Sequence, residues 1–107
     1  MRWSDAELDE VIEEVIVDAY DDSEQLTSFE CAFQEADFPI AGRALGRPVT
    51  VLSVVFDGNP RKGLRALLRV DGQAHELDLI DVAVSDDPRG TARLVAAYRR
   101  WWVGSSG

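Results

Sequence analysis

The 107-residue chain is poor in several residue types, and each shortage narrows the class of protein. Its single cysteine, Cys31, excludes an internal disulfide. No apolar run approaches the roughly 18 residues that a membrane span needs, and the acidic start lacks the apolar stretch of a signal peptide. Lysine occurs once against ten arginines, a bias typical of GC-rich bacterial genomes. We therefore expect a bacterial, cytoplasmic protein that does not contact a membrane.

Basic residues are missing from Trp3 to Gly42, a stretch that contains thirteen carboxylates. The remainder after Gly42 carries ten basic and seven acidic groups, so the net charge of −9 is concentrated in the N-terminal third. Like charges one helical turn apart repel by roughly 0.2–0.5 kcal/mol per pair. Such crowding favours binding of a cation or a basic protein. The lack of basic clusters argues against binding to nucleic acid.

The patterns of known catalytic sites are also missing. No glycine-rich phosphate loop follows a strand, and no serine, histidine and acid arrangement is present. Cys31 has acidic neighbours rather than the positive charge that activates a thiol, so we expect it to be a buried apolar filler. His75 is expected at a packed or edge position of a strand. The sequence thus predicts a protein that is not an enzyme.

Two helices are predicted in the acidic third. Ser4-Asp5-Ala6-Glu7 is a capping box, and apolar residues then recur at helical spacing over residues 5 to about 20. Asp21-Asp22-Ser23 caps a second helix, which Phe38-Pro39 ends because a residue before proline avoids helical geometry. The N-terminal third is therefore predicted to be an acidic helical hairpin.

The apolar spacing changes from helical to strand-like after Gly42. The valine-rich stretch Pro48 to Phe56 predicts a strand, and Leu64 to Leu79 predicts a hairpin with a turn at Asp71-Gly72. This register places Arg65 opposite Asp78 and Leu68 opposite His75. Three or four such short, sharply turned strands predict a small, antiparallel, SH3-like curled sheet.

A last helix is predicted over residues 88 to about 102, after the N-cap pattern Asp87-Pro88. Its aromatic side, which includes Trp101 and Trp102, is expected to anchor the core, with a partner-binding patch as the alternative. Together the elements predict a single α+β domain over residues 1–103, followed by a flexible tail over 104–107.

Carboxylates form a column on the first predicted helix. Glu10, Glu14 and Asp18 are four residues apart, and Glu13 lies beside them. Calcium takes six to eight oxygen ligands and suits clustered carboxylates, whereas zinc prefers cysteine and histidine. The chain has no EF-hand, because Arg61 stands where the loop after Asp57 requires an acid. The column indicates either a calcium site or the solvated face of an amphipathic helix.

Several segments resemble the small cyanobacterial-type calcium-binding proteins, which are acidic, cytoplasmic and lack EF-hands. The resemblance covers residues 10 to 102. The segments that carry it are Glu13–Tyr20, Glu24-Gln25, Phe38-Pro39, Leu77–Val82, Thr91-Ala92-Arg93 and the pair Tyr98 and Trp101. It implies a compact α+β domain that binds calcium through acidic side chains, for buffering or signalling.

The resemblance also implies candidate ligands. Glu13, Glu14 and Asp18 match acids of the family, and Glu35 lies near an acid that precedes the Phe-Pro step. Asp81 is a further candidate at the end of the predicted hairpin. The chain departs from the family at Ala83, where the resemblance implies another acid.

Our leading hypothesis is therefore an intracellular calcium buffer or sensor with Glu14 and Asp18 as the main ligands, supported by Glu13, Glu35 and Asp81. The alternative is an acidic interaction module, an inhibitor or adaptor that docks on a basic protein partner without metal. A calcium-specific effect on stability distinguishes the two hypotheses, because diffuse charge screening does not select one divalent ion.

Overall fold

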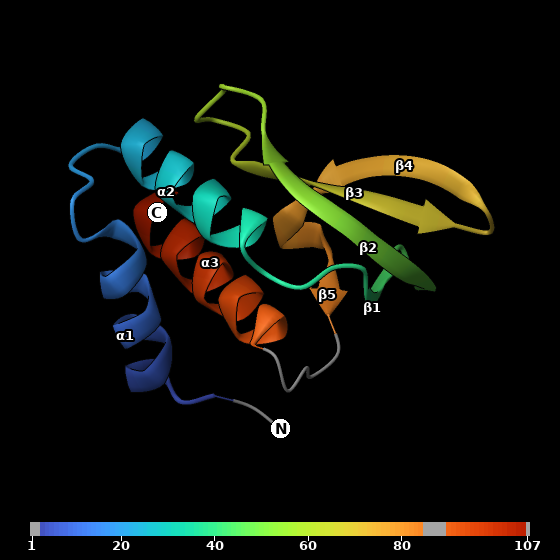
Figure 1. Cartoon of the computed structure of the whole chain (residues 1–107), viewed down its shortest axis with the longest axis horizontal. Coiled ribbons are helices and arrows are strands. Elements are labelled where there is room, and N and C mark those ends of the chain that lie inside the picture. The colour runs from blue at the N-terminus through green and yellow to red at the C-terminus, as the bar shows by residue number, and fades with distance from the viewer. Residues whose placement is uncertain (1–2, 85–89, 107) are drawn as a thin grey trace.

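The computed structural model describes residues 3–84 and 90–106. Its three helices gather on one side of the molecule and its five-stranded antiparallel sheet on the other (Figure 1). In chain order the elements are α1 (Asp5–Ile16), α2 (Asp22–Gln34), β1 (Ile40–Ala44), β2 (Arg47–Phe56), β3 (Leu64–Val70), β4 (Gln73–Asp78), the 3₁₀ turn η1 (Leu79–Asp81), β5 (Ala83–Val84) and α3 (Thr91–Ser106). None of these helices is long and apolar enough to cross a membrane.

The two N-terminal helices begin where their capping residues predict. Ser4 Oγ accepts the backbone N–H of Glu7, and Asp21 Oδ1 accepts that of Glu24. Helix α1 is shorter than predicted and ends at Ile16, because the chain turns there and the Ala19 N–H bonds to the Ile16 carbonyl. The acidic third is nevertheless two helices joined by a short loop, and α1 packs against both α2 and α3.

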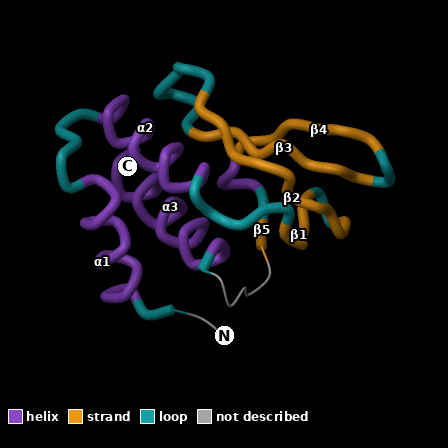
Figure 2. Tube along the Cα trace, viewed as in Figure 1, coloured by secondary structure: helices purple, strands orange, loops and turns teal. Residues whose placement is uncertain are grey.

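The sheet has the strand order β4-β3-β2-β1-β5, and all of its neighbours are antiparallel. Arg65 lies opposite Asp78 and Leu68 opposite His75, as predicted. A register shift between Val51 and Ser53 bends β2, and Figure 2 shows the resulting curl of the strands. The predicted α+β class, with helices at both ends of the chain and a curled antiparallel sheet, is confirmed.

The core lies between α2, α3 and the concave face of the sheet. Phe29 and Phe33 on α2 meet Tyr98 on α3 edge to face, with ring centroids 5.4 and 6.4 Å apart. Trp101 is almost fully buried and donates its indole N–H to Gln25 Oε1 at 2.8 Å. The prediction that Trp101 anchors the core is therefore confirmed, and its contact with Gln25 holds α3 against the start of α2.

The C-terminal helix differs from its predicted range. The predicted N-cap at Asp87-Pro88 lies outside the described residues, and the described part of α3 begins at Thr91. The buried Thr91 hydroxyl donates to the Asp37 carbonyl and accepts the Asp37 N–H, which ties this helix end to the segment before β1. The helix continues to Ser106, beyond the domain boundary expected at 103.

Candidate functional site

The five predicted ligands lie on separate parts of the surface. Glu13 and Glu14 are on α1, Asp18 is in the turn after it, Glu35 caps the end of α2 and Asp81 is in η1. All five are exposed. Within residues 3–84 and 90–106, none of these carboxylates takes a hydrogen bond or an ion pair. Each is therefore available to a ligand from outside the chain.

The described residues do not bring these carboxylates into one cage. In the part of the chain that the structure describes, no three side chains of histidine, cysteine, aspartate or glutamate are grouped to hold a metal ion. Calcium requires six to eight oxygens, so a calcium site built from the described residues takes one or two carboxylates and completes its shell with neutral oxygens and water. These residues would therefore bind calcium only weakly, with water supplying part of the coordination shell.

One such arrangement lies at the corner between α1 and α2. A surface hollow of about 470 Å³ at this corner is lined by Val15, Val17, Asp18, Ala19, Ser23, Glu24, Thr27 and Ser28. It combines two carboxylates with three hydroxyl groups, all of them oxygen donors of the kind that calcium prefers. Of the five predicted ligands, Asp18 alone lines this hollow. We refer to it below as the α1–α2 corner.

Two helix ends of opposite polarity meet at the α1–α2 corner, because the first turn of α2, whose N–H groups carry positive partial charge, also lines the hollow. The hollow lies at the C-terminal end of α1, where helix carbonyls concentrate negative partial charge. The last turn of α1 contains no basic residue to neutralise that charge. Gln25 Nε2 donates to the Ala19 carbonyl at 3.4 Å, and Thr27 Oγ1 donates to the Ser23 carbonyl at 2.9 Å. The Gln25 contact holds the loop against α2, whereas the Thr27 contact lies within the first turns of α2.

Glu24 is the second acid of the α1–α2 corner and was not among the predicted ligands. Its position follows from the Asp21 cap, because the Glu24 backbone N–H bonds to Asp21 Oδ1 at 2.8 Å and fixes the first turn of α2. The signal was present in the spacing from Asp21 to Glu24, which is typical of a helix start. That spacing does not reveal which residues of the preceding loop face Glu24.

Other acidic side chains already form ion pairs or hydrogen bonds within the chain. Arg100 on α3 contacts both Asp9, at 2.8 Å, and Asp5, at 3.3 Å. The hydrogen bond from Arg100 holds the pKa of Asp9 below its usual value, and the same contact raises the pKa of Arg100. Glu30 accepts the Phe56 backbone N–H at 2.6 Å. The N-terminal charge is thus partly compensated by groups far along the chain.

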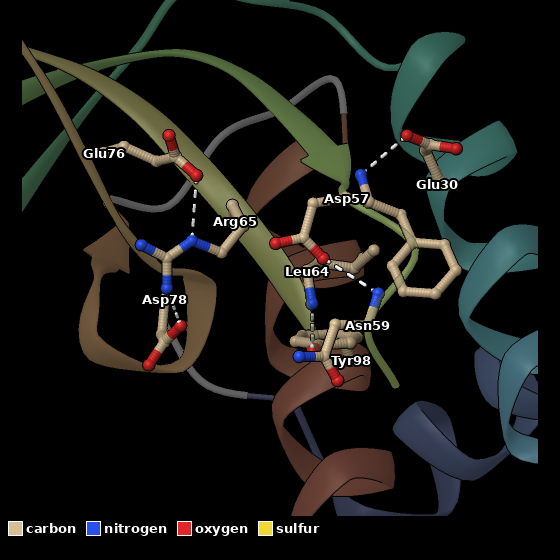
Figure 3. A network of polar contacts seen from close by, with 9 residues as sticks. Glu30, Asp57, Asn59, Leu64, Arg65, Glu76, Asp78 and Tyr98 are labelled. Atoms are coloured by element: carbon tan, nitrogen blue, oxygen red, sulfur yellow. Dashed lines mark hydrogen bonds and ion pairs between the residues drawn. The ribbon is translucent and has the colours of Figure 1, made fainter. Parts of the chain in front are cut away.

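Figure 3 shows polar contacts that join β3 to β4 and one that joins β3 to α3. Arg65 lies between Glu76 and Asp78 and bonds to both, and the Glu76 contact raises the pKa of Arg65. The Leu64 backbone N–H donates to the buried Tyr98 hydroxyl at 2.9 Å. Burial raises the pKa of Tyr98 to about 12. The predicted placement of Arg65 opposite Asp78 is confirmed, and the two side chains form an ion pair.

Cys31 and His75 occupy peripheral positions. Cys31 is exposed, so the expectation of a buried filler is wrong. The reason is its offset of two residues from both Phe29 and Phe33, which turns it away from the buried face of α2. His75 lies on the edge strand β4, as expected, and is exposed.

Comparison with known proteins gives structural relatives only. Neither a family model nor a curated protein matches the sequence. The crystal structure of Anabaena CcbP superposes with a TM-score of 0.74 and 22% identity, covering 94% of this chain and 93% of that one. A calcium binding protein in the calcium-binding form superposes with a TM-score of 0.72, the same identity and the same coverage. The resemblance drawn from the sequence motifs is thus confirmed at the level of the fold.

Proposed function

We propose that this protein binds calcium at its acidic helical hairpin, without an EF-hand. The observation that carries the proposal is the fold that it shares, over 94% of the chain, with a calcium binding protein in the calcium-binding form. The concentration of thirteen carboxylates before Gly42 supports it independently, because a divalent cation relieves their mutual repulsion.

The α1–α2 corner is our proposed position for the ion. Asp18 and Glu24 would supply charged oxygens, and the hydroxyls of Ser23, Thr27 and Ser28 would supply neutral ones. Glu14, Glu13, Glu35 and Asp81 remain predicted ligands outside this hollow. With few protein carboxylates per ion, we expect a dissociation constant on the order of 10⁻⁴ M or weaker. Such an affinity is weaker than that of cytosolic buffers, roughly 10⁻⁹–10⁻⁸ M, and of sensors, roughly 10⁻⁷–10⁻⁵ M, so the site would fill only at high local calcium.

Thermal unfolding tests the proposal. Binding to the folded state alone stabilises it by about 2.7 kcal/mol at a hundredfold excess over the dissociation constant. At about 10 mM calcium, roughly a hundredfold excess over 10⁻⁴ M, we expect the melting temperature of a domain of this size to rise by roughly 10 °C. Magnesium, and sodium chloride at matched ionic strength, should raise it much less. Equal effects of all three salts would show diffuse screening instead of a site.

Variants locate the ion. We expect Asp18→Asn and Glu24→Gln each to reduce the calcium-induced shift, with Asp22→Asn as the matched control. Asp22 is an exposed acid in the same first turn of α2 and does not line the hollow. Glu35→Gln and Asp81→Asn test the predicted ligands that lie elsewhere. If either of these removes the response while Asp18→Asn and Glu24→Gln retain it, the ion lies outside the α1–α2 corner.

An acidic interaction module is the second candidate. It is favoured by the spread of exposed acids along α1, which do not converge on one point within the described residues. A basic protein would contact such a face without metal. Binding of polyarginine that persists in chelator and disappears at high salt would support this function. Loss of that binding on adding calcium would indicate that both ligands use the same acids.

A further inference from the structure

The β1–β2 and β3–β4 hairpins of the sheet line a pocket. Its volume is about 340 Å³, within the range of about 300–1,000 Å³ usual for small-molecule sites. Its apolar lining comes from Ala44, Leu45, Val49, Leu68, Val70 and Leu77. We call it the sheet mouth; Figure 1 shows the two hairpins whose residues line it.

The polar lining of the sheet mouth is cationic or neutral. Arg47 and His75 are the two polar residues of its lining, and no carboxylate is among them. The α1–α2 corner contrasts with it, because its charged lining residues are Asp18 and Glu24, whereas a third hollow combines Asp5 and Asp9 with Arg99 and Arg100. In a chain of net charge −9, this is a local reversal of charge, which favours an anionic ligand.

The ion pair of Arg47 does not prevent it from binding a ligand. Its Nη1 lies 3.3 Å from Asp71 Oδ2, and the two side chains are 65% and 83% exposed. Exposed pairs of this kind contribute little stability. An incoming carboxylate could therefore take the guanidinium in place of Asp71, with two parallel N–H donors available to it.

Leu45 gives an independent reason to regard the sheet mouth as functional. It is 81% exposed and lies at the tip of the β1–β2 turn with a φ of 55°. Together with Gly46, at 73°, it forms a two-residue turn with both φ positive, in which asparagine, aspartate or glycine is favoured. A leucine there is strained, and it buries little of its apolar surface on folding. Such outliers are common at ligand sites.

We propose that the sheet mouth binds a small apolar carboxylate, such as an aryl or branched alkyl acid. The apolar body would pack on Val70 and Leu77, which are partly exposed, beside the exposed Leu45. The carboxylate would bind Arg47, with the His75 ring as a second polar contact. This site does not depend on calcium, because no acidic residue of the lining could hold a cation.

Amide chemical-shift mapping tests the proposal on the intact chain in chelator. The probes are 4-phenylbutanoate and its neutral amide, 4-phenylbutanamide. We expect saturable shifts confined to the β1–β2 turn, the end of β3 and β4 for the acid, and about tenfold weaker binding of the amide. Equal affinity for acid and amide, or shifts that saturate elsewhere, would overturn the proposal.

A pair of arginine variants separates a specific contact from general attraction. Arg47→Gln should weaken binding of 4-phenylbutanoate about tenfold. Arg43→Gln is the matched control, since Arg43 lies on the same β1–β2 hairpin, is exposed, bonds to the Gly46 carbonyl and does not line the mouth. The affinity of the Arg43→Gln variant for 4-phenylbutanoate should stay within about twofold of that of the unmodified chain. Equal weakening by the two variants would contradict a direct role of Arg47.

Discussion

Arg100 on α3 and Asp9 on α1 form a two-contact ion pair, with Nε to Oδ1 at 2.8 Å and Nη2 to Oδ2 at 3.3 Å. The two residues are 91 positions apart in the chain. Helix α1 has no fully buried residue, so this contact helps to hold an element that the core holds only loosely. It also shows that the basic C-terminal part of the chain compensates some of the acidic N-terminal part.

Replacing Arg100 should change the titration of Asp9. The pKa of Asp9 is lowered in the folded chain, so its charged form stabilises the fold above the unfolded-state pKa. That contribution is lost as the pH falls through the lowered value. We expect Arg100→Gln to return the pKa of Asp9 toward its ordinary value and to remove this part of the acid sensitivity.

Carbon-detected NMR titration of the side-chain carboxyl groups measures this pKa directly. The matched control is Arg93→Gln, an exposed arginine on the same helix, which should leave the Asp9 titration unchanged. An Asp9 titration that is identical with and without Arg100 would contradict the pairing.

Tyr98→Phe tests the contact between the sheet and α3. The phenylalanine keeps the ring packing but leaves the buried Leu64 N–H without an acceptor. We expect the free energy of unfolding to fall by about 1–3 kcal/mol in urea denaturation. Tyr20→Phe is the control, because Tyr20 is 85% exposed, and it should change stability by less than about 0.5 kcal/mol. Similar effects of the two substitutions would argue against the buried hydrogen bond.

Gly63→Ala should be more destabilising than Gly58→Ala. Both glycines have positive φ, at 69° and 93°, so both substitutions strain the backbone. A Cβ on Gly63 would also approach the Trp102 ring to 2.7 Å, whereas one on Gly58 meets nothing within 4 Å. We expect the difference in unfolding free energy to be about 1–3 kcal/mol. Equal losses would show that α3 does not pack against the start of β3 as closely as described.

Leu45→Asn should stabilise the fold while weakening the binding of 4-phenylbutanoate at the sheet mouth. Asparagine tolerates the left-handed conformation at this turn, so we expect the free energy of unfolding to rise by about 1 kcal/mol. Val103→Asn, which removes an equally exposed apolar side chain from α3, should give no such gain. A gain in stability together with weaker binding of 4-phenylbutanoate would identify Leu45 as a residue retained for function. A loss of stability would contradict the strain at this turn.

The sequence predicted those elements whose signals are local. Ser4 and Asp21 cap the helices as expected, and the Asp71-Gly72 turn fixed the register that pairs Arg65 with Asp78. These features depend on neighbours within a few residues or across a two-residue turn, where backbone geometry leaves little choice.

Strands β1 and β5 were not predicted, because tertiary contact rather than propensity creates them. β5 has two residues and pairs with β1 at Gly42 and Arg43. The close approach needs a glycine, since a Cβ on Gly42 would lie 2.6 Å from the Ala83 carbonyl oxygen. No local pattern identifies which distant strand will come so close.

The candidate ligands were predicted only in part for the same reason. Helical spacing indicated the column of acids that ends at Asp18, and this residue does line the α1–α2 corner. Sequence could not show that Glu24 lies across from it, or that Arg100 engages Asp9. Both depend on how α1 packs against α2 and α3.

Calcium binding at the helical hairpin is most directly tested by following the side-chain carboxyl and backbone amide resonances during a calcium titration. The account predicts saturable shifts centred on Asp18, Ser23 and Glu24, with a dissociation constant on the order of 10⁻⁴ M and little response to magnesium. Shifts that grow linearly without saturation, or that are the same for both ions over all exposed acids, would contradict a calcium site at this corner.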